Sequence, residues 1–171
     1  MAINLKDIRT AVQNYLATKV TVSISALTPA VPGTLNPNEE FTFSVTATNA
    51  ATTVGGIKLI NVKYHLKVTN SAVAKLIVPP ATTAKARNGP SSSSDTLTPG
   101  TQVTEMFLFP VGDKSQLAAG ETDTISGLKG KSGVAAGNTQ ITLECRADPD
   151  LDFLFPKNEN SAPFPRTVNV V

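Results

Sequence analysis

The alternation of apolar and polar residues is the sequence feature that most constrains the fold. From Val20 onward, apolar side chains recur at every second position, most clearly in segments 41–47 and 62–68. Successive side chains of a strand point to opposite faces of a sheet, so this period of two predicts strands with one buried and one hydrated face. We expect eight such strands, at residues 20–25, 41–48, 62–69, 74–78, 103–109, 122–126, 139–146 and 167–171.

Gly, Pro, Asn and Ser clusters separate these segments, and no long helix lies between them to make a parallel crossover. The sequence therefore predicts a mainly β protein, an immunoglobulin-like antiparallel β-sandwich at residues 20–171 with a short N-terminal α-helix at residues 1–19. A polar, low-complexity stretch at residues 81–102 is expected to be a long flexible loop that is too polar to pack. The inward positions of the strands predict a core of Phe41, Phe43, Val45, Tyr64, Leu66, Ile141 and Leu143.

The N-terminal helix carries one narrow apolar stripe. Asn4 suits the N-cap position, and Asp7 lies in the first turn. Four apolar side chains repeat at three- and four-residue spacing and so share one face, namely Leu5, Ile8, Val12 and Leu16. A helix of about four turns is marginal alone in water, so something must cover this stripe. We predict that it forms an interface with a protein partner, either a second copy or a host particle.

The order of turns and strands resembles a known family. An opening strand, VTVSISALTP, leads through a Pro loop to the Thr-rich strand TLNPNEEFTFSVTATNA, which closes on Asn49. Later come LAAGETDTI, GVAAGNTQITLECRADPDLDF and KNENSAPFPRTVNVV. From Val20 to Val171 this pattern is similar to the bacterial cell-adhesion-related domain, CARDB. The resemblance implies an immunoglobulin-like module with a non-enzymatic adhesion or scaffold role.

Two features near the C-terminus suggest binding. The carboxylates of Asp148, Asp150 and Asp152 alternate and could converge on Ca²⁺, which prefers oxygen ligands. The preferred interpretation is a solvated corner, because Asp is a common turn former. We therefore expect no cofactor, with calcium at this corner as the alternative. Three aromatic residues nearby either join the core or form a patch for another subunit, namely Phe153, Phe155 and Phe164.

Composition argues against several other functions. Fifteen basic and thirteen acidic residues give a net charge of +2, which predicts no strong attraction to nucleic acid or an anionic membrane. One Cys and one His exclude a disulfide framework and a Cys/His zinc site. His65 has no carboxylate nearby in sequence, and Cys145 shares an apolar face with Leu143, so neither is expected to be catalytic. No aromatic residues interleave with the lysines of the middle strands, Lys58, Lys63, Lys67 and Lys75, which argues against an oligonucleotide platform.

These observations favour a non-enzymatic structural subunit or surface-decorating module of a larger assembly, with a phage virion or phage-tail-like particle as the leading hypothesis. Lys6, Asp7 and Arg9 interrupt the region where a secretory signal would be apolar, so we expect cytoplasmic synthesis followed by a place on the particle surface. No stretch reaches the 18 or so apolar residues of a membrane span, so no membrane insertion is expected. One alternative is a bacterial cell-surface or secreted adhesion module exported by an unrecognised route. Another is a carbohydrate-binding domain, which the absence of Trp disfavours.

Overall fold

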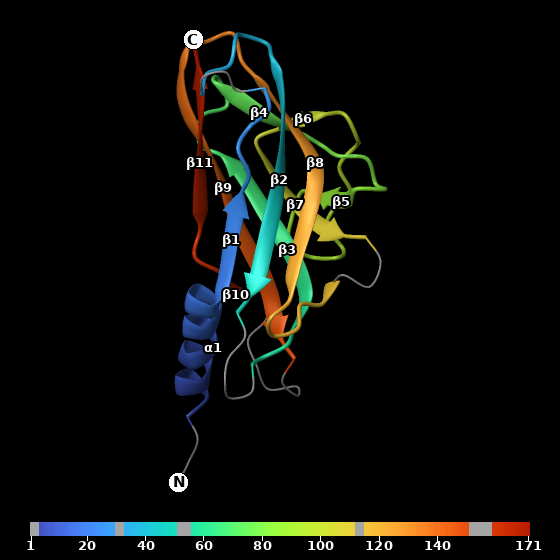
Figure 1. The fold of residues 1–171 in the computed structure, drawn as a ribbon. Coiled ribbons are helices and arrows are strands. Elements are labelled where there is room, and N and C mark those ends of the chain that lie inside the picture. Colours follow the sequence, from blue (N-terminus) through green and yellow to red (C-terminus); the bar gives the residue numbers. More distant parts are fainter. Residues whose placement is uncertain (1–3, 30–32, 51–55, 112–114, 151–158) are drawn as a thin grey trace.

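Two antiparallel sheets face each other in the computed structural model, which describes residues 4–29, 33–50, 56–111, 115–150 and 159–171. One sheet has the strand order β1-β2-β8-β4-β6, and the other has the order β10-β9-β3-β7-β5, with β11 also paired to β9. The elements are α1 (Leu5–Lys19), β1 (Val20–Ile24), β2 (Glu40–Asn49), β3 (Leu59–Val68), β4 (Ala74–Ile77), β5 (Ala84–Arg87), β6 (Gln102–Val103), β7 (Glu105–Pro110), β8 (Thr122–Ser132), β9 (Gly137–Pro149), β10 (Glu159–Asn160) and β11 (Phe164–Val170). Figure 1 shows the two layers, with α1 at one pole and the end of β11 at the other. The predicted immunoglobulin-like β-sandwich with an N-terminal helix is confirmed.

The core lies between the two sheets and follows the predicted alternation. All seven predicted core residues are buried, with at most 3% of any of them exposed. Each of the eight predicted strands is present, and several run further than the alternation indicated. β3, for example, begins at Leu59, and β8 continues to Ser132. The period of two therefore identified the buried faces of β2, β3 and β9 correctly.

One polar pair joins the two layers inside this core. The hydroxyl of Tyr64 on β3 donates a 2.5 Å hydrogen bond to Oδ2 of Asp123 on β8. Burial, followed by this bond to the carboxylate, raises the pKa of Tyr64 well above its ordinary value. Both residues are buried and have little access to water. The bond between them therefore gives each of these polar groups the hydrogen-bond partner that it needs inside the core.

The segment 81–102 is not the unpacked loop that its composition suggested. It contains β5, whose Ala84 and Ala86 are buried, and β5 pairs with β7. The residues that follow fold back as a hairpin, in which the Leu97 N–H donates to the Ala86 carbonyl at 2.9 Å. The prediction failed because alanine signals a strand weakly, whereas alternate alanines are small enough to pack flat against a core.

The helix begins and ends as the sequence indicated. The Lys6 N–H donates to the Asn4 side chain, which confirms Asn4 as the N-cap, and Asp7 lies in the first turn. α1 leads directly into β1, and the carbonyl of Lys19 accepts a hydrogen bond from the Ala50 N–H at 2.8 Å. The helix is therefore fastened to the start of the sandwich by its last residue.

Part of the apolar stripe of α1 is covered by the chain's own domain. Val12 and Leu16 belong to the core, with 4% and 0% exposed, whereas Ile8 is half-buried. The expectation that a partner covers the stripe is thus corrected for Val12 and Leu16, because the helix packs on β1 and β10 at its pole. A docking role for Leu5 and Ile8, in the first half of the stripe, stays a prediction.

A buried asparagine holds this pole together. Asn49, at the end of β2, accepts a 3.0 Å hydrogen bond from the Tyr15 hydroxyl of α1. Its amide nitrogen donates to the carbonyl of Ile57 at 2.8 Å and to that of Leu117 at 3.1 Å. One fully buried side chain thus connects the helix, the entry to β3 and the connection before β8.

Substitution of the stripe tests whether the sandwich itself supports α1. Leu16→Ala is expected to lower the free energy of unfolding by about 2–5 kcal/mol, because it opens a cavity in a filled core. Ile8→Ala, the matched control on the same face, is expected to cost less because Ile8 is only half-buried. Denaturant melts measure both. A loss below about 1 kcal/mol for Leu16→Ala would mean that the helix does not rest on the sandwich.

Candidate functional site

The outer faces of the two sheets differ in chemistry. On the five-stranded sheet the outward residues of β2 and of the first half of β8 are mostly threonines and serines, whereas Glu40 and Lys129 lie at the other end of the pair. Some of the threonines pair across the two strands. The hydroxyls of Thr46 and Thr124 lie 3.0 Å apart, and those of Thr48 and Thr122 lie 2.9 Å apart. The outer face of the six-stranded sheet instead carries six cationic and aromatic side chains, here named the basic-aromatic face: Lys63, His65, Arg87, Phe107, Phe109 and Arg146.

Phe107 anchors one half of the basic-aromatic face. It is only 5% exposed, although it lies outside the main hydrophobic core. The His65 ring stacks on it with centroids 4.3 Å apart and planes inclined by 2°, and the Arg146 guanidinium lies 5.2 Å from the ring centroid. Aromatic stacking and cation–π attraction both stabilise such contacts, so a second ordered cluster lies on the outside of the sheet.

Two carboxylates hold the His65 ring in this position. Its Nε2 lies 2.6 Å from Oε1 of Glu105, and its Nδ1 lies 3.3 Å from Oε2 of Glu144. Arg146 reaches the same Glu144 oxygen at 3.4 Å. Because both ring nitrogens and one ring face are engaged, the arrangement suits a structural role better than proton transfer to a substrate.

Sequence inspection missed this cluster because its members come from three strands. β3 lies between β7 and β9, and the register places His65 opposite both Phe107 and Glu144. None of these residues is near His65 in sequence. Only the pairing register brings them together, and alternation along single strands does not reveal it.

Phe109 anchors the other half of the basic-aromatic face. Lys63 Nζ lies 5.6 Å from the ring centroid, and the Arg87 guanidinium lies 5.5 Å from it. The expectation that no aromatic residues interleave with the lysines is therefore wrong, because β7 supplies Phe107 and Phe109 across the sheet. Nucleic acid as a partner gains no support from this, since carboxylates share the same face.

A loop folds over this half of the face. Lys63 Nζ donates a 2.9 Å hydrogen bond to the carbonyl of Pro90, and Arg87 donates to the carbonyl of Ser94. Burial lowers the pKa of Lys63, while the negative charge of Asp148 acts in the opposite direction. Both cations thus hold the hairpin that follows β5, residues 88–95, against the sheet. This segment is named the 88–95 hairpin below.

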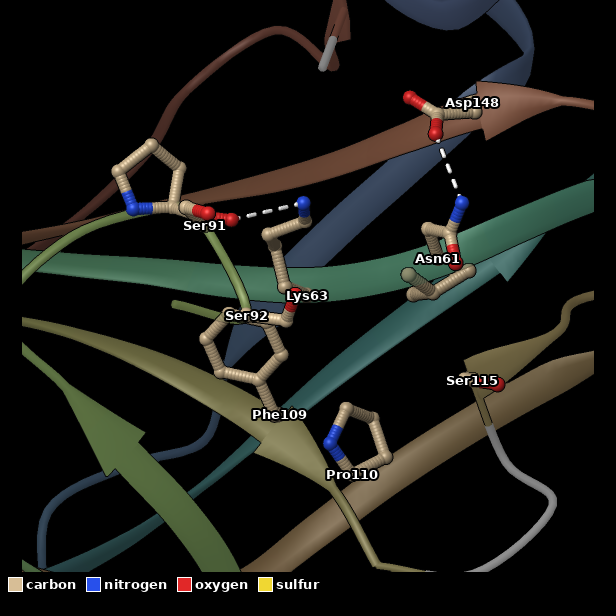
Figure 2. A pocket seen from close by; sticks show the side chains of 10 residues that line it. Asn61, Lys63, Ser91, Ser92, Phe109, Pro110, Ser115 and Asp148 are labelled. Atoms are coloured by element: carbon tan, nitrogen blue, oxygen red, sulfur yellow. Dashed lines mark hydrogen bonds between the residues drawn. The ribbon is translucent and has the colours of Figure 1, made fainter. Parts of the chain in front are cut away.

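A pocket of about 430 Å³ opens beneath this loop (Figure 2). Asn61 on its wall has a φ of 53°, in the left-handed region, beside a register shift between β3 and β9. Its amide nitrogen donates to Oδ2 of Asp148 at 2.8 Å. The pocket is lined by Asn61, Val62, Lys63, Pro90, Ser91, Ser92, Phe109, Pro110, Ser115 and Asp148.

The predicted calcium residues are only partly described. Asp148 bonds to Asn61, while Asp150 lies 3.4 Å from Lys58 Nζ, so the two carboxylates have different partners. Asp152 lies outside the described residues. Within the described ranges, no three His, Cys, Asp or Glu side chains gather where a metal ion could be held. Calcium binding at this corner therefore stays an alternative to the solvated corner.

The remaining residues that the sequence singled out are the C-terminal aromatic residues and Cys145. Phe164 packs partly buried against the core, with the Arg166 guanidinium 5.6 Å from its ring, while Phe153 and Phe155 lie outside the described residues. Cys145 is fully buried, and burial raises its pKa to about 12, with the charge of Asp123 adding to the effect. In the described part of the chain, no helix has the length and apolar character to cross a membrane.

Comparison with known proteins supports the fold. No protein-family model and no curated protein sequence matches the chain. Among solved structures, it is similar to one described as "AvmM Catalyzes Macrocyclization in Alchivemycin A Biosynthesis", with a TM-score of 0.53 and 12% identity over 89% of this chain and 88% of that chain. The seventh ScaB type I cohesin from Pseudobacteroides cellulosolvens gives a TM-score of 0.40 and 11% identity, covering 89% and 92% of the two chains. PapD-like domain 7 of human CEP192 gives 0.36 and 12%, covering 99% and 88%.

Of these three scores, one exceeds 0.5, and at 12% identity it shows a shared β-sandwich and nothing about chemistry. Function must therefore be inferred from the basic-aromatic face and the pocket beside it.

Cys145 gives a direct check on burial in the six-stranded sheet. A pKa raised to about 12 keeps the thiol protonated at pH 8, and only the thiolate reacts quickly with alkylating reagents. We expect iodoacetamide to leave the native protein unmodified at pH 8 and to modify it fully in denaturant, as measured by mass spectrometry. Rapid modification of the native protein would contradict the burial of Cys145 in the core between the two sheets.

Proposed function

We propose that this chain is a non-enzymatic protein-interaction module that contacts its partner through the basic-aromatic face. The observation that carries the proposal is the asymmetry between the two outer faces. Aromatic residues and arginine are enriched at protein interfaces, whereas serine is depleted there. By this measure the partly exposed Arg87, Phe109 and Arg146 favour the six-stranded sheet as the side that meets the partner, and the hydroxyl-rich part of the five-stranded sheet faces water.

The face also has the order that a binding surface needs. Its rings and cations are already fixed by stacking, carboxylates and the 88–95 hairpin, so association would cost little side-chain freedom. Lys67, Lys85 and Glu105 are exposed around these fixed residues and supply charges for steering and register.

At a finer level, we propose that the module is a structural subunit or decoration of a phage virion or phage-tail-like particle, displayed on the particle surface after cytoplasmic synthesis. The first half of the α1 stripe, Leu5 and Ile8, would add a contact at the pole, to a second copy or to the host particle. The likeness to the CARDB family stays a prediction, and it favours the alternative of a cell-surface or secreted adhesion module.

Immunogold electron microscopy separates these two locations. Particles are purified from cells that carry the gene and labelled with an antibody raised against the chain. We expect gold on virions or tail-like particles and none on the envelope of intact cells. Labelling confined to the cell envelope would replace the particle proposal with the adhesion alternative.

Two matched charge reversals test which face binds. Lys85 and Lys75 are both exposed and each is the second residue of a four-residue strand, Lys85 on β5 of the six-stranded sheet and Lys75 on β4 of the five-stranded sheet. We expect Lys85→Glu to weaken rebinding to particles stripped of the chain by about threefold to tenfold, and Lys75→Glu to leave it unchanged. Cosedimentation measures both. Equal effects, or a larger effect of Lys75→Glu, would contradict the assignment of the face.

A further inference from the structure

We propose that the pocket beneath the 88–95 hairpin binds one pyranose unit of a glycan. This site goes beyond the interaction function above and does not depend on it. The pocket shares Lys63 and Phe109 with the basic-aromatic face, but sugar binding there can be measured on the isolated chain without a protein partner. The inference rests on the chemistry of the pocket wall, on its size and on how firmly its polar groups are held.

The polar wall pairs a cation with an anion. Lys63 places an ammonium group, and Asp148 a carboxylate, on the same side of the pocket (Figure 2). Neighbouring hydroxyls of a sugar both donate and accept hydrogen bonds, so one diol can face a donor and an acceptor together. A phosphate or sulfate would lie against Asp148, and a metal cation would lie against Lys63. The charge pattern therefore favours a neutral ligand with many hydroxyls.

Another part of the lining is apolar. The rings of Phe109 and Pro110 lie across the pocket from the Asn61–Asp148 pair, and Lys63 lies over the Phe109 ring (Figure 2). A pyranose has the matching division, with C–H groups on its faces and hydroxyls around its edge. Hydroxyls of Ser91, Ser92 and Ser115 complete the lining. A purely apolar ligand would cover these hydroxyls and charged groups and separate them from water, which is costly.

The size and the order of the pocket also suit this ligand. A volume of about 430 Å³ lies within the range of roughly 300–1,000 Å³ that is usual for small-molecule sites. Asn61 is held by its bond to Asp148, and Lys63 by its bond to Pro90, so the polar wall is in place before binding. Preorganisation of this kind lowers the entropy cost of binding a small, weakly held ligand.

Chemical-shift mapping by NMR tests the proposal on the whole chain. The probes are the methyl glycosides of glucose, galactose, mannose and N-acetylglucosamine, each at about 20 mM because single sugar units commonly bind at millimolar level. We expect at least one glycoside to shift the amide signals of Asn61, Lys63 and Ser91 in a saturable manner. Inorganic phosphate at the same concentration is expected to shift them less.

Two variants locate the binding. Lys63→Met keeps an unbranched apolar side chain beside Phe109 but removes the ammonium, and it is expected to weaken binding about tenfold or more. Lys67→Met, the control on the same face of β3, lies outside the pocket lining and is expected to bind as the parent does. Ser92→Trp, at an exposed loop position, is expected to fill the pocket and abolish binding without affecting the fold.

The outcomes separate cleanly. Saturable shifts that Lys63→Met weakens and Ser92→Trp removes support the proposal, provided that thermal melts show both variants folded. Absence of pocket shifts with every glycoside overturns it, as do shifts that persist in folded Ser92→Trp. A stronger response to phosphate than to any glycoside also overturns it and assigns an anion site instead. None of these results bears on whether Lys85→Glu weakens particle binding, so the two proposals fail independently.

Discussion

Burial of one apolar face of each sheet against the other is the constraint on which the rest of the structure depends. It consumes every inward position of the long strands and leaves little room for chemistry inside, apart from the Tyr64–Asp123 bond that joins the layers. The outer faces are free of this constraint and can differ. On the five-stranded sheet the outer face carries rows of hydroxyls with lysines at one side, whereas on the six-stranded sheet it is a network of rings, cations and carboxylates. We therefore expect the functional contacts of this protein on the outer faces of the two sheets.

The same constraint explains how much of the fold could be predicted from the sequence. A buried face forces alternation along each long strand, so residues such as Phe41 and Leu143 were identified as core without knowledge of their neighbours. The sequence did not predict several short strands, because so few residues show no clear alternation. β5 buries only two alanines, and β6 and β10 are two residues each. Asp123 was not predicted as a core residue because a charged side chain normally faces water. Its inward position is explained only by the hydroxyl of Tyr64, which lies opposite it in the other sheet.

The candidate site depended on information that a single strand does not contain. His65, Phe107 and Glu144 become neighbours through the register of β7, β3 and β9, and Asn61 meets Asp148 at a bulge. For the helix, too, the sequence predicted the local pattern but not the contacts with distant residues. Its stripe was evident from spacing, but the sequence did not show that Tyr15 and Asn49 fasten α1 to its own sandwich and so cover Val12 and Leu16.

The central claim is that the six-stranded sheet turns its outer face toward a partner. Lysine footprinting tests it most directly, because exposed lysines lie on both outer faces: Lys67 and Lys85 on one, Lys75 and Lys129 on the other. An amine-reactive label is applied to the free chain and to the assembled particle, and mass spectrometry compares each site. The account predicts that assembly protects Lys67 and Lys85 and leaves Lys75 and Lys129 as reactive as before. Protection of Lys75 and Lys129 instead, or of none of the four, would contradict it.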